Sequence, residues 1–356
     1  MGAFLIRRLF YGALVLFGVL TVVFFIFNIL PGDPARMMLG QRADQEAIDE
    51  INKELGLDRG IFFQYALYLN DLSPLSVHSS SESSSLYYNE ARYGGKVLIT
   101  TDNYYLVAKA PYLRRSYQSQ KEVSQILFES LPETAVLAIA SIIIATLLGI
   151  VLGILSALFQ DSWLDKVLLV LATSGMALPS FFVGIIAAWL FGFLWADVTG
   201  LNMSGSLYEV DDLGRGEFIN WSNLFLPALT LGVRPLAVIL QLSRNSLLDV
   251  LSMDYVRTAK AKGLNFKTTI LKHSMKNAMN PVITAISGMF ASLMAGAVFV
   301  EIIFSWKGIG WEIVNALEKY DLPIVMGAVL IIAVIFVSIN IIVDILYGIV
   351  DPRVRI

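Results

Sequence analysis

The sequence predicts an all-α polytopic membrane protein with six transmembrane helices. Hydrophobic residues make up 56% of its 356 residues and charged residues only 15%, whereas a soluble domain carries about 25% charged residues. Six largely uncharged segments approach or exceed the roughly 20 residues that cross a bilayer as a helix. Lys and Arg concentrate in segments that are expected to stay in the cytoplasm. The expected spans are residues 9–30, 134–159, 167–196, 224–243, 282–300 and 322–343.

The composition also excludes several functions. The net charge of −3 gives no support for binding nucleic acid. The chain has no cysteine, which excludes disulfides and thiolate metal sites. Its two histidines, His78 and His273, lie far apart in sequence and are predicted on opposite sides of the membrane. We therefore expect no metal site and no catalytic residues.

The first span follows Arg7 and Arg8, which predicts a cytoplasmic N-terminus. A secretory signal peptide is the alternative for this segment. The uncharged run 9–30 is too long for a signal peptide, and it lacks a small-residue cleavage site. We therefore assign residues 1–30 to the N-terminal end and first span, and residues 31–131 to an extracytoplasmic region. A short amphipathic helix is expected at 45–55.

Spans two to four carry features of the inside of a helical bundle. Span two is rich in Ala, Gly and Ser, which let helix backbones approach closely. Pro179 is expected to kink span three. Arg234 lies near the middle of span four, where a buried arginine costs at least about 2.5 kcal/mol and is a functional-site candidate. The candidate residues of a translocation path are Pro179, Arg234 and Glu301. For Arg234 the alternatives are a shifted helix or a structural ion pair with a bundle-facing acid such as Glu301.

The segment 244–281 between spans four and five is markedly basic, which predicts a cytoplasmic loop. It has two carboxylates, Asp249 and Asp254, against seven basic residues: Arg244, Arg257, Lys260, Lys262, Lys267, Lys272 and Lys276.

This loop is expected to be folded. Helical spacing places Tyr255, Ala259 and Lys262 on one face, with Val256 beside them. Gly263 can end that helix in the left-handed conformation. Asn265 fits the N-cap of a second helix, which should end or kink at Pro281. A folded basic loop suits docking against another protein; the alternative is a solvated loop lying on anionic lipid.

Residues 255–264, YVRTAKAKGL, resemble the "EAA" loop of ABC importer permeases, in the form found in the dipeptide/oligopeptide/nickel permease family. The motif's third alanine falls on Ala259 and its glycine on Gly263. The first two motif positions are Arg257 and Thr258 instead of Glu and Ala. Five further stretches resemble elements of this family in the same order. They are PGDP at 31–34, LGLD at 55–58, LPSF at 178–181, E-x-x-F-S-x-x-G-I-G at 301–310 and DPR at 351–353.

The resemblance implies a type I ABC importer (MetI-like) transmembrane domain, with an extracytoplasmic insert after the first helix. Its core would cover 132–347 and its cytoplasmic tail 348–356. It also implies a bacterial inner membrane location with both termini cytoplasmic, and a coupling helix that sits in a cleft of the ATPase subunit. The residues assigned to this coupling loop are Asp254, Tyr255, Arg257, Thr258, Ala259, Lys262, Gly263 and Leu264.

Residues 70–121 depart from the family pattern, which usually crosses this region in fewer residues. Residues 73–85 hold eight serines, typical of a low-complexity linker or exposed loop, and 96–109 could form a hairpin. The insert could receive a binding protein or shape the outer mouth. The alternative, which we favour, is a lineage-specific decoration packed on the outer face.

No G-x-x-x-x-G-K-[ST] motif occurs in the sequence, so ATP and Mg²⁺ would bind to a partner chain. The implied partners are a second permease chain, two cytoplasmic ATPases, an extracytoplasmic substrate-binding protein and membrane lipid. The expected function is ATP-driven import of peptides or similar small solutes. One alternative is an ATP-independent secondary transporter or channel, although spans one to three and four to six show no internal similarity. Another is a membrane-anchored scaffold whose insert is the working part.

Overall fold

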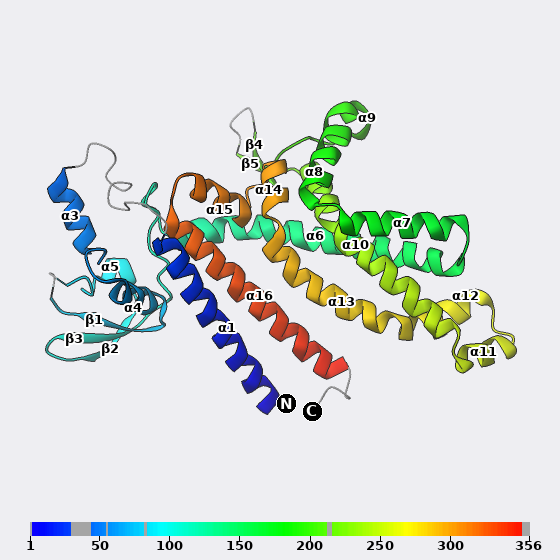
Figure 1. Ribbon diagram of the computed structural model, residues 1–356, viewed down its shortest axis with the longest axis horizontal. Helices are drawn as coiled ribbons and strands as arrows, with labels where there is room; N and C mark the ends of the chain where they lie inside the picture. Colours follow the sequence, from blue (N-terminus) through cyan, green and yellow to red (C-terminus); the bar gives the residue numbers. More distant parts are fainter. Residues whose placement is uncertain (1, 30–43, 55, 82–83, 212–215, 351–356) are drawn as a thin grey trace. The chain divides into compact units, whose positions relative to one another are not determined.

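The computed structural model describes residues 2–29, 44–54, 56–81, 84–211 and 216–350 (Figure 1). The chain divides into two compact units. We call the first the bundle unit; it comprises Met1–Gly12, Ser130–Trp311 and Ile332–Ile356. The second, the sheet unit, comprises Ala13–Glu129 and Glu312–Ile331.

Within the described ranges, four helices are long and apolar enough to cross a membrane. Two bent helix pairs raise the number to six if each pair counts as one span, which agrees with the six predicted spans. The four long helices are α1 (Gly2–Ile29), α6 (Val123–Leu158), α10 (Ser222–Leu251) and α16 (Leu322–Val350). The first bent pair is α7 (Trp163–Ala177) with α8 (Ser180–Trp189) and the π-helical turn η1 (Leu190–Leu194). The second joins α12 (Phe266–Thr268), η2 (Thr269–Ser274) and α13 (Met275–Gly296) to α14 (Val298–Phe304).

The predicted kink at Pro179 is a full break in the helix. The helices on either side of it are bent by 110°. Leu178 is extended, with φ −74° and ψ 135°, because the ring of a following proline disfavours helical geometry. Pro179 then occupies the N-cap position of α8. One apolar segment of the sequence therefore forms two helices.

The core of the bundle unit lies where α6, α8, α10, α13 and α14 meet. Its fully buried members include Leu137, Ile239 and Trp306. α10 packs on α7, α8 and α13. Arg8, near the N-terminal end of α1, and Asp344, near the C-terminal end of α16, form an ion pair of 3.1 Å.

Short elements complete the bundle unit. They are α9 (Ala196–Thr199), the hairpin β4 (Tyr208–Val210) and β5 (Glu217–Ile219), and α11 (Asp254–Ala261). Helix α15 (Ile309–Glu318) begins in this unit.

The sheet unit contains the helices α3 (Gln45–Glu54), α4 (Ile61–Leu72) and α5 (Glu90–Tyr93). Its three strands, β1 (Leu75–Ser79), β2 (Lys96–Thr100) and β3 (Tyr104–Ala108), form an antiparallel sheet in the order β1-β3-β2. The hairpin predicted at 96–109 is confirmed as β2 and β3, and the amphipathic helix predicted at 45–55 as α3. The serine-rich stretch, predicted as a linker or loop, instead contains β1, in which Ser76 and His78 are buried and Val77 is exposed.

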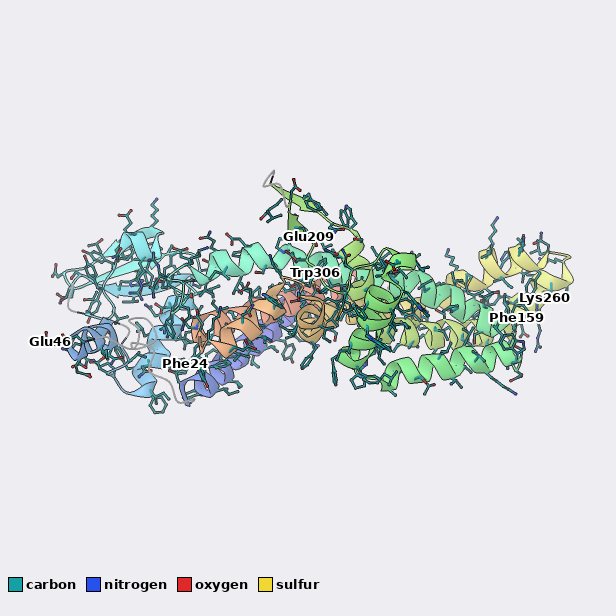
Figure 2. The ribbon with its side chains drawn as sticks, turned by 90° about the horizontal axis from the view of Figure 1, so that it is seen from above. Phe24, Glu46, Phe159, Glu209, Lys260 and Trp306 are labelled. Carbon is teal, nitrogen blue, oxygen red and sulfur yellow. The ribbon has the colours of Figure 1, made fainter. Side chains whose placement is uncertain are left out.

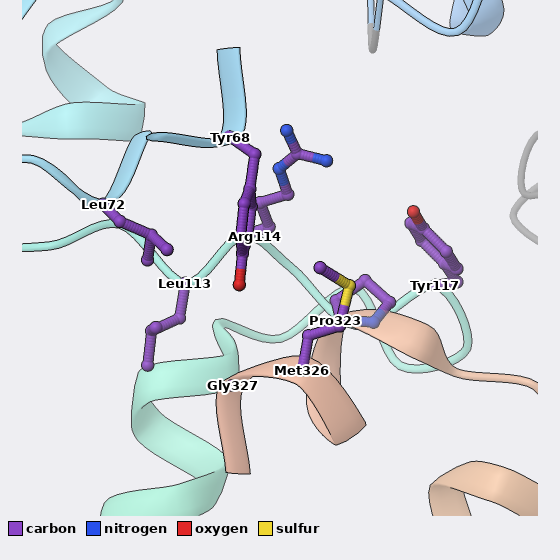
Figure 3. A pocket seen from close by; sticks show the side chains of 8 residues that line it. All are labelled: Tyr68, Leu72, Leu113, Arg114, Tyr117, Pro323, Met326 and Gly327. Atoms are coloured by element: carbon purple, nitrogen blue, oxygen red, sulfur yellow. The ribbon is translucent and has the colours of Figure 1, made fainter. Parts of the chain in front are cut away.

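A buried ion pair holds the interior of the sheet unit together. Nε of Arg114 lies 3.0 Å from a carboxylate oxygen of Asp71, whose side chain is only 2% exposed. The ammonium group of Lys109 donates a hydrogen bond to the backbone carbonyl of Asp71. A cavity of about 20 Å³ beside Tyr68, Arg114 and Met326 (Figure 3) has room for about one water molecule, so it is too small to receive a transported solute.

Three of the sequence elements that resemble the permease family lie wholly or partly outside the described residues. They are the PGDP element at 31–34, Leu55 of the LGLD element, and the DPR element at 351–353.

Candidate functional site

Helix α11 is attached to the bundle unit through one face. Val256 is fully buried and Ala259 is 7% exposed, and the helix packs on α10 and η2. The Tyr255 hydroxyl accepts a hydrogen bond of 2.9 Å from the Asn277 side-chain amide. The predicted face of Tyr255, Val256 and Ala259 is therefore the attached face of α11. Lys262, predicted on the same face, is exposed.

The remaining surface of this loop combines cations with large apolar side chains. Arg257, Thr258 and Lys260 are exposed on α11; Figure 2 labels Lys260. Asp254 is exposed as well and lies 3.7 Å from Arg257, a surface ion pair of small energetic value. Exposed apolar groups bordered by charges are typical of surfaces that bind another protein. The apolar side chains, 39–66% exposed, are Met253, Leu264, Phe266 and Leu271.

Gly263 ends α11 as the sequence predicts, with φ +78°. The amide of Leu264 donates to the carbonyl of Ala259 (3.3 Å), and the amide of Gly263 donates to that of Lys260 (3.0 Å). These two bonds form a Schellman motif, which satisfies carbonyls left free at a helix end. A Cβ added at Gly263 would meet no atom within 4 Å. The requirement for glycine here therefore comes from the backbone angle and not from lack of space.

The second predicted helix begins as expected but does not end as expected. The side chain of Asn265 accepts a hydrogen bond of 2.8 Å from the amide of Thr268, which confirms the predicted N-cap. Of the two outcomes predicted at Pro281, a helix end or a kink, the helix end is wrong, because α13 continues through Pro281 to Gly296. A proline removes one backbone donor, and helices in membranes tolerate this because neighbouring groups satisfy the freed carbonyl.

Arg234 does not form the structural ion pair considered for it. Its side chain is exposed on α10. In the described part of the chain Arg234 makes no ion pair, and both carboxylate oxygens of Glu301 bind other groups. Pro179 is likewise exposed. Within the described residues, no hydrogen bond or ion pair joins any two of the three candidate path residues.

Arg234 belongs to a polar stripe along one face of α10. Helical spacing aligns it with Gln241, Asn245 and Asp249, of which Asn245 and Asp249 are exposed and Gln241 is partly buried. Polar side chains are costly against lipid tails, so they usually face a bundle interior or a water-filled path.

A second stripe of small or polar residues runs along α13, which packs against α10. Its members recur every three or four residues and all are exposed in this chain: Asn277, Asn280, Thr284, Gly288 and Ser292. Sequence reasoning singled out only Arg234 from these two faces, although the spacing of the other residues was visible.

Glu301 is fully buried and closes a turn. One carboxylate oxygen accepts from the Thr134 hydroxyl at 2.8 Å, and the other accepts from the backbone amide of Trp311 at 3.1 Å. The amide of Ile309 donates to the Thr134 hydroxyl at 2.8 Å. Ile309 and Trp311 open α15, so Glu301 stabilises free donors at a helix N-terminus.

The E-x-x-F-S-x-x-G-I-G element is explained by this turn. Ser305 is left-handed, with φ +54°. The indole N–H of Trp306 donates to the carbonyl of Glu133 at 3.0 Å. A Cβ on Gly308 would lie 2.5 Å from a Glu301 carboxylate oxygen and would also overlap the Thr134 hydroxyl. Glycine at 308 therefore leaves room for the carboxylate.

Sequence reasoning missed a buried ion pair at the base of the loop. Both carboxylate oxygens of Asp165 on α7 accept from the guanidinium of Arg244 on α10, each at 2.7 Å. The two residues lie 79 positions apart, so no local spacing indicates the pairing. The only signal was one acid and one arginine at the ends of neighbouring apolar segments.

These features define a membrane-spanning protein with a folded, cationic loop and, in its sequence, no Walker A motif for ATP binding. Residues 149–356 match the family model described as binding-protein-dependent transport system inner membrane component. Residues 1–84 match the model of the N-terminal part of such membrane components.

Curated relatives match the chain over nearly its full length. The dipeptide transport system permease protein of Alkalihalophilus pseudofirmus is 33% identical over 366 residues, covering 99% of each chain. The probable D,D-dipeptide transport system permease protein of Escherichia coli K12 is 33% identical, covering 96% of this chain and 94% of the relative. The glutathione transport system permease protein of Escherichia coli K12 is 29% identical, covering 99% and 98%.

A solved amino acid ABC transporter chain aligns with a TM-score of 0.41 at 12% identity, covering 61% of this chain and 92% of that one, a likeness too weak to bear on the fold. The chain belongs to the family of binding-protein-dependent transport system inner membrane components. It is a multi-pass inner membrane protein and the permease subunit of an ABC importer, and it is not itself the ATPase.

Proposed function

We propose that this permease forms the translocation path for di- or oligopeptides or similar small solutes. The observation that carries this proposal is the match to permeases named for dipeptide, D,D-dipeptide and glutathione transport, each over 96% or more of this chain. The solutes in these three names share a peptide character. An importer of peptides needs a polar route through the membrane, and the exposed stripes on α10 and α13 supply one.

In this proposal Arg234 faces the path. An arginine exposed on a membrane helix, with no ion pair within the described residues, is costly against lipid and suited to the carboxylate of a peptide. Pro179 ends α7 and starts α8, and so shapes the wall of the path. Glu301 has a different role, because its carboxylate is fully used in the turn before α15.

The loop 244–281 couples the permease to a separate ATPase, which binds ATP and Mg²⁺. Val256 and Ala259 attach α11 to its own chain. Asp254, Arg257, Thr258, Lys262 and Leu264 are exposed and available to a partner, while Tyr255 and Gly263 fix the geometry of the loop. Closure of the ATPases on ATP displaces α11, and the bundle reorients the path between its two openings.

The proposed assembly contains a second permease chain, identical or homologous, two ATPase subunits and a substrate-binding protein. Loop 244–281 and both termini lie in the cytoplasm, since basic segments stay inside. Residues 31–131 are extracytoplasmic, 132–347 form the transmembrane core and 348–356 a cytoplasmic tail.

Co-purification tests this proposal. The tagged chain is isolated in mild detergent from its native host and its partners are identified by mass spectrometry. Recovery of an ATPase, reduced at least tenfold by Arg257→Glu with Lys260→Glu, supports docking through α11. The matched control reverses the charge of Lys96 in the sheet unit and should leave recovery unchanged. Recovery of the chain without any ATPase would contradict the proposal.

A further inference from the structure

The Asp165–Arg244 pair joins α7 to α10 at the start of loop 244–281. Two parallel hydrogen bonds of 2.7 Å join the guanidinium to the two carboxylate oxygens. The side chains are 2% and 14% exposed. Bidentate charge-assisted bonds fix the orientation of both partners as well as their separation. Such a buried pair adds little net stability, because the cost of desolvating both charges offsets their attraction.

Asp165 also binds the helix that precedes it. The Ser156 hydroxyl on α6 donates to one carboxylate oxygen at 2.5 Å, and the amide of Asp161 donates to the other at 3.0 Å. The Asp165 carboxylate therefore ties together α6, the turn after it, α7 and α10. Figure 2 labels Phe159, in that turn, and Lys260 of α11 toward the same end of the bundle unit.

The backbones of helices α6 and α10 are in close contact near this ion pair. A Cβ on Gly153 would lie 2.6 Å from the carbonyl oxygen of Leu240 and 3.2 Å from the amide of Arg244. A Cβ on Gly149 would lie 3.0 Å from the carbonyl oxygen of Leu236. Such backbone contact between helices depends on small residues. It leaves little freedom for α6 to slide along α10.

Helix α10 leads almost directly into α11. It ends at Leu251, and α11 begins at Asp254. The amides of Ser252 and Met253 both donate to carbonyls at the end of α10, so the connection is itself hydrogen-bonded. A displacement of α11 therefore acts on the C-terminal end of α10, about two helical turns beyond Arg244.

We propose that Asp165 and Arg244 are positioning residues that form a clasp, through which displacement of α11 moves α6, α7 and α10 as one rigid body. Without the clasp, α10 could bend at its end, and motion of α11 would be lost before it reached the polar stripes of the path. This inference rests on the proposed coupling through α11. It adds a role for two residues outside that helix.

Uptake per ATP hydrolysed in proteoliposomes of the assembled complex tests the clasp. The variant Asp165→Asn with Arg244→Gln removes both charges together and so leaves no unpaired charge. We expect it to hydrolyse ATP while uptake per ATP falls at least tenfold. Arg244→Lys, which keeps the charge but loses the bidentate bonds, provides a second test. The matched control is Arg8→Gln with Asp344→Asn, which removes another interhelical pair and should leave the ratio unchanged. A wild-type ratio in both clasp variants would overturn the inference.

The distance between α7 and α10, measured with and without ATP, distinguishes a clasp that transmits motion from a pair that only stabilises the fold. The natural chain has no cysteine, so spin labels can be placed at Val170→Cys on α7 and Asp249→Cys on α10, both exposed. The expected distance is the same with and without ATP, and it becomes ATP-dependent when Asp165→Asn and Arg244→Gln are both introduced. An ATP-dependent distance with the clasp intact would overturn the inference. Normal coupling when α11 itself is altered by Gly263→Pro would instead refute the proposed function.

Discussion

The hydroxyl of Thr134 donates a hydrogen bond of 2.8 Å to the carboxylate of Glu301, joining residues 167 positions apart in sequence. The same hydroxyl accepts from the amide of Ile309 at 2.8 Å. One small side chain on α6 thus connects α14 to the start of α15. All three groups are buried, where an unpaired polar atom is costly.

Replacing this hydroxyl should destabilise the bundle unit. Thr134→Val keeps the shape but leaves a carboxylate oxygen and an amide without their partner, at about 1–3 kcal/mol for each unpaired group. We expect a lower melting temperature in detergent. The matched control is Thr173→Val on α7, because the Thr173 hydroxyl is exposed and bonds only within its own helix. Equal melting temperatures for the two variants would show that the Thr134 bonds contribute nothing.

The left-handed backbone of Gly263 leads to a prediction that separates conformation from size. Gly263→Asn should retain transport because asparagine tolerates this conformation. Gly263→Val should lose most transport, because a β-branched residue is strongly disfavoured at positive φ and the Schellman bonds at the end of α11 would break. Uptake of a labelled dipeptide measures both. Normal uptake with valine would mean that the end of α11 is not needed for coupling.

Arg234 provides a test of the path. Arg234→Ala should leave membrane insertion and ATPase recovery intact, since the side chain makes no ion pair within the described residues, while uptake falls at least tenfold. Arg234→Lys keeps the positive charge and should retain part of the uptake. The contradicting result is an alanine variant that assembles and transports at the wild-type rate.

His78 predicts a pH dependence for the sheet unit. Burial lowers the pKa of His78, and Lys109 and Arg92 lower it further while Asp71 opposes them. The imidazole bonds to Ser76 and packs on Tyr88 and Tyr93. The folded unit keeps His78 neutral where the unfolded chain, with a pKa of about 6.5, already binds a proton. Its contribution to stability is therefore present above about pH 7 and is lost as the pH falls below about 6.5.

Hydrogen exchange of residues 70–121 at pH 7.5 and pH 5 measures this effect. After correction for the slower intrinsic exchange at pH 5, we expect lower protection factors at pH 5 than at pH 7.5, and a smaller pH difference in His78→Gln. The control is His273→Gln, which changes the only other histidine and should keep the full difference. An unchanged difference in His78→Gln would assign the pH effect to other groups.

Much of the fold followed from local sequence patterns. Hydropathy gave the spans, because a membrane helix must be apolar over its whole length. The end of α11 at Gly263, the N-cap at Asn265 and the hairpin at 96–109 each depend on residues close together in sequence. Local rules identify such features because the interacting groups are neighbours in the chain.

The remaining features depend on tertiary contacts. The bonds of Asp165 with Arg244, and of Thr134 with Glu301, join residues far apart in sequence. Strand β1 forms inside a serine-rich stretch because β3 supplies its hydrogen bonds, which composition cannot indicate. Two prolines that look alike in sequence also behave differently: Pro179 separates two helices, whereas Pro281 lies inside one.

The most direct test of the central claim is uptake of a radiolabelled dipeptide into proteoliposomes that contain this chain and its co-purified partners. We predict uptake only when ATP and a substrate-binding protein are both supplied, with loss of uptake in the Arg257→Glu, Lys260→Glu variant. Uptake by this chain alone, driven by an ion gradient and without ATP, would contradict the account and indicate a secondary transporter.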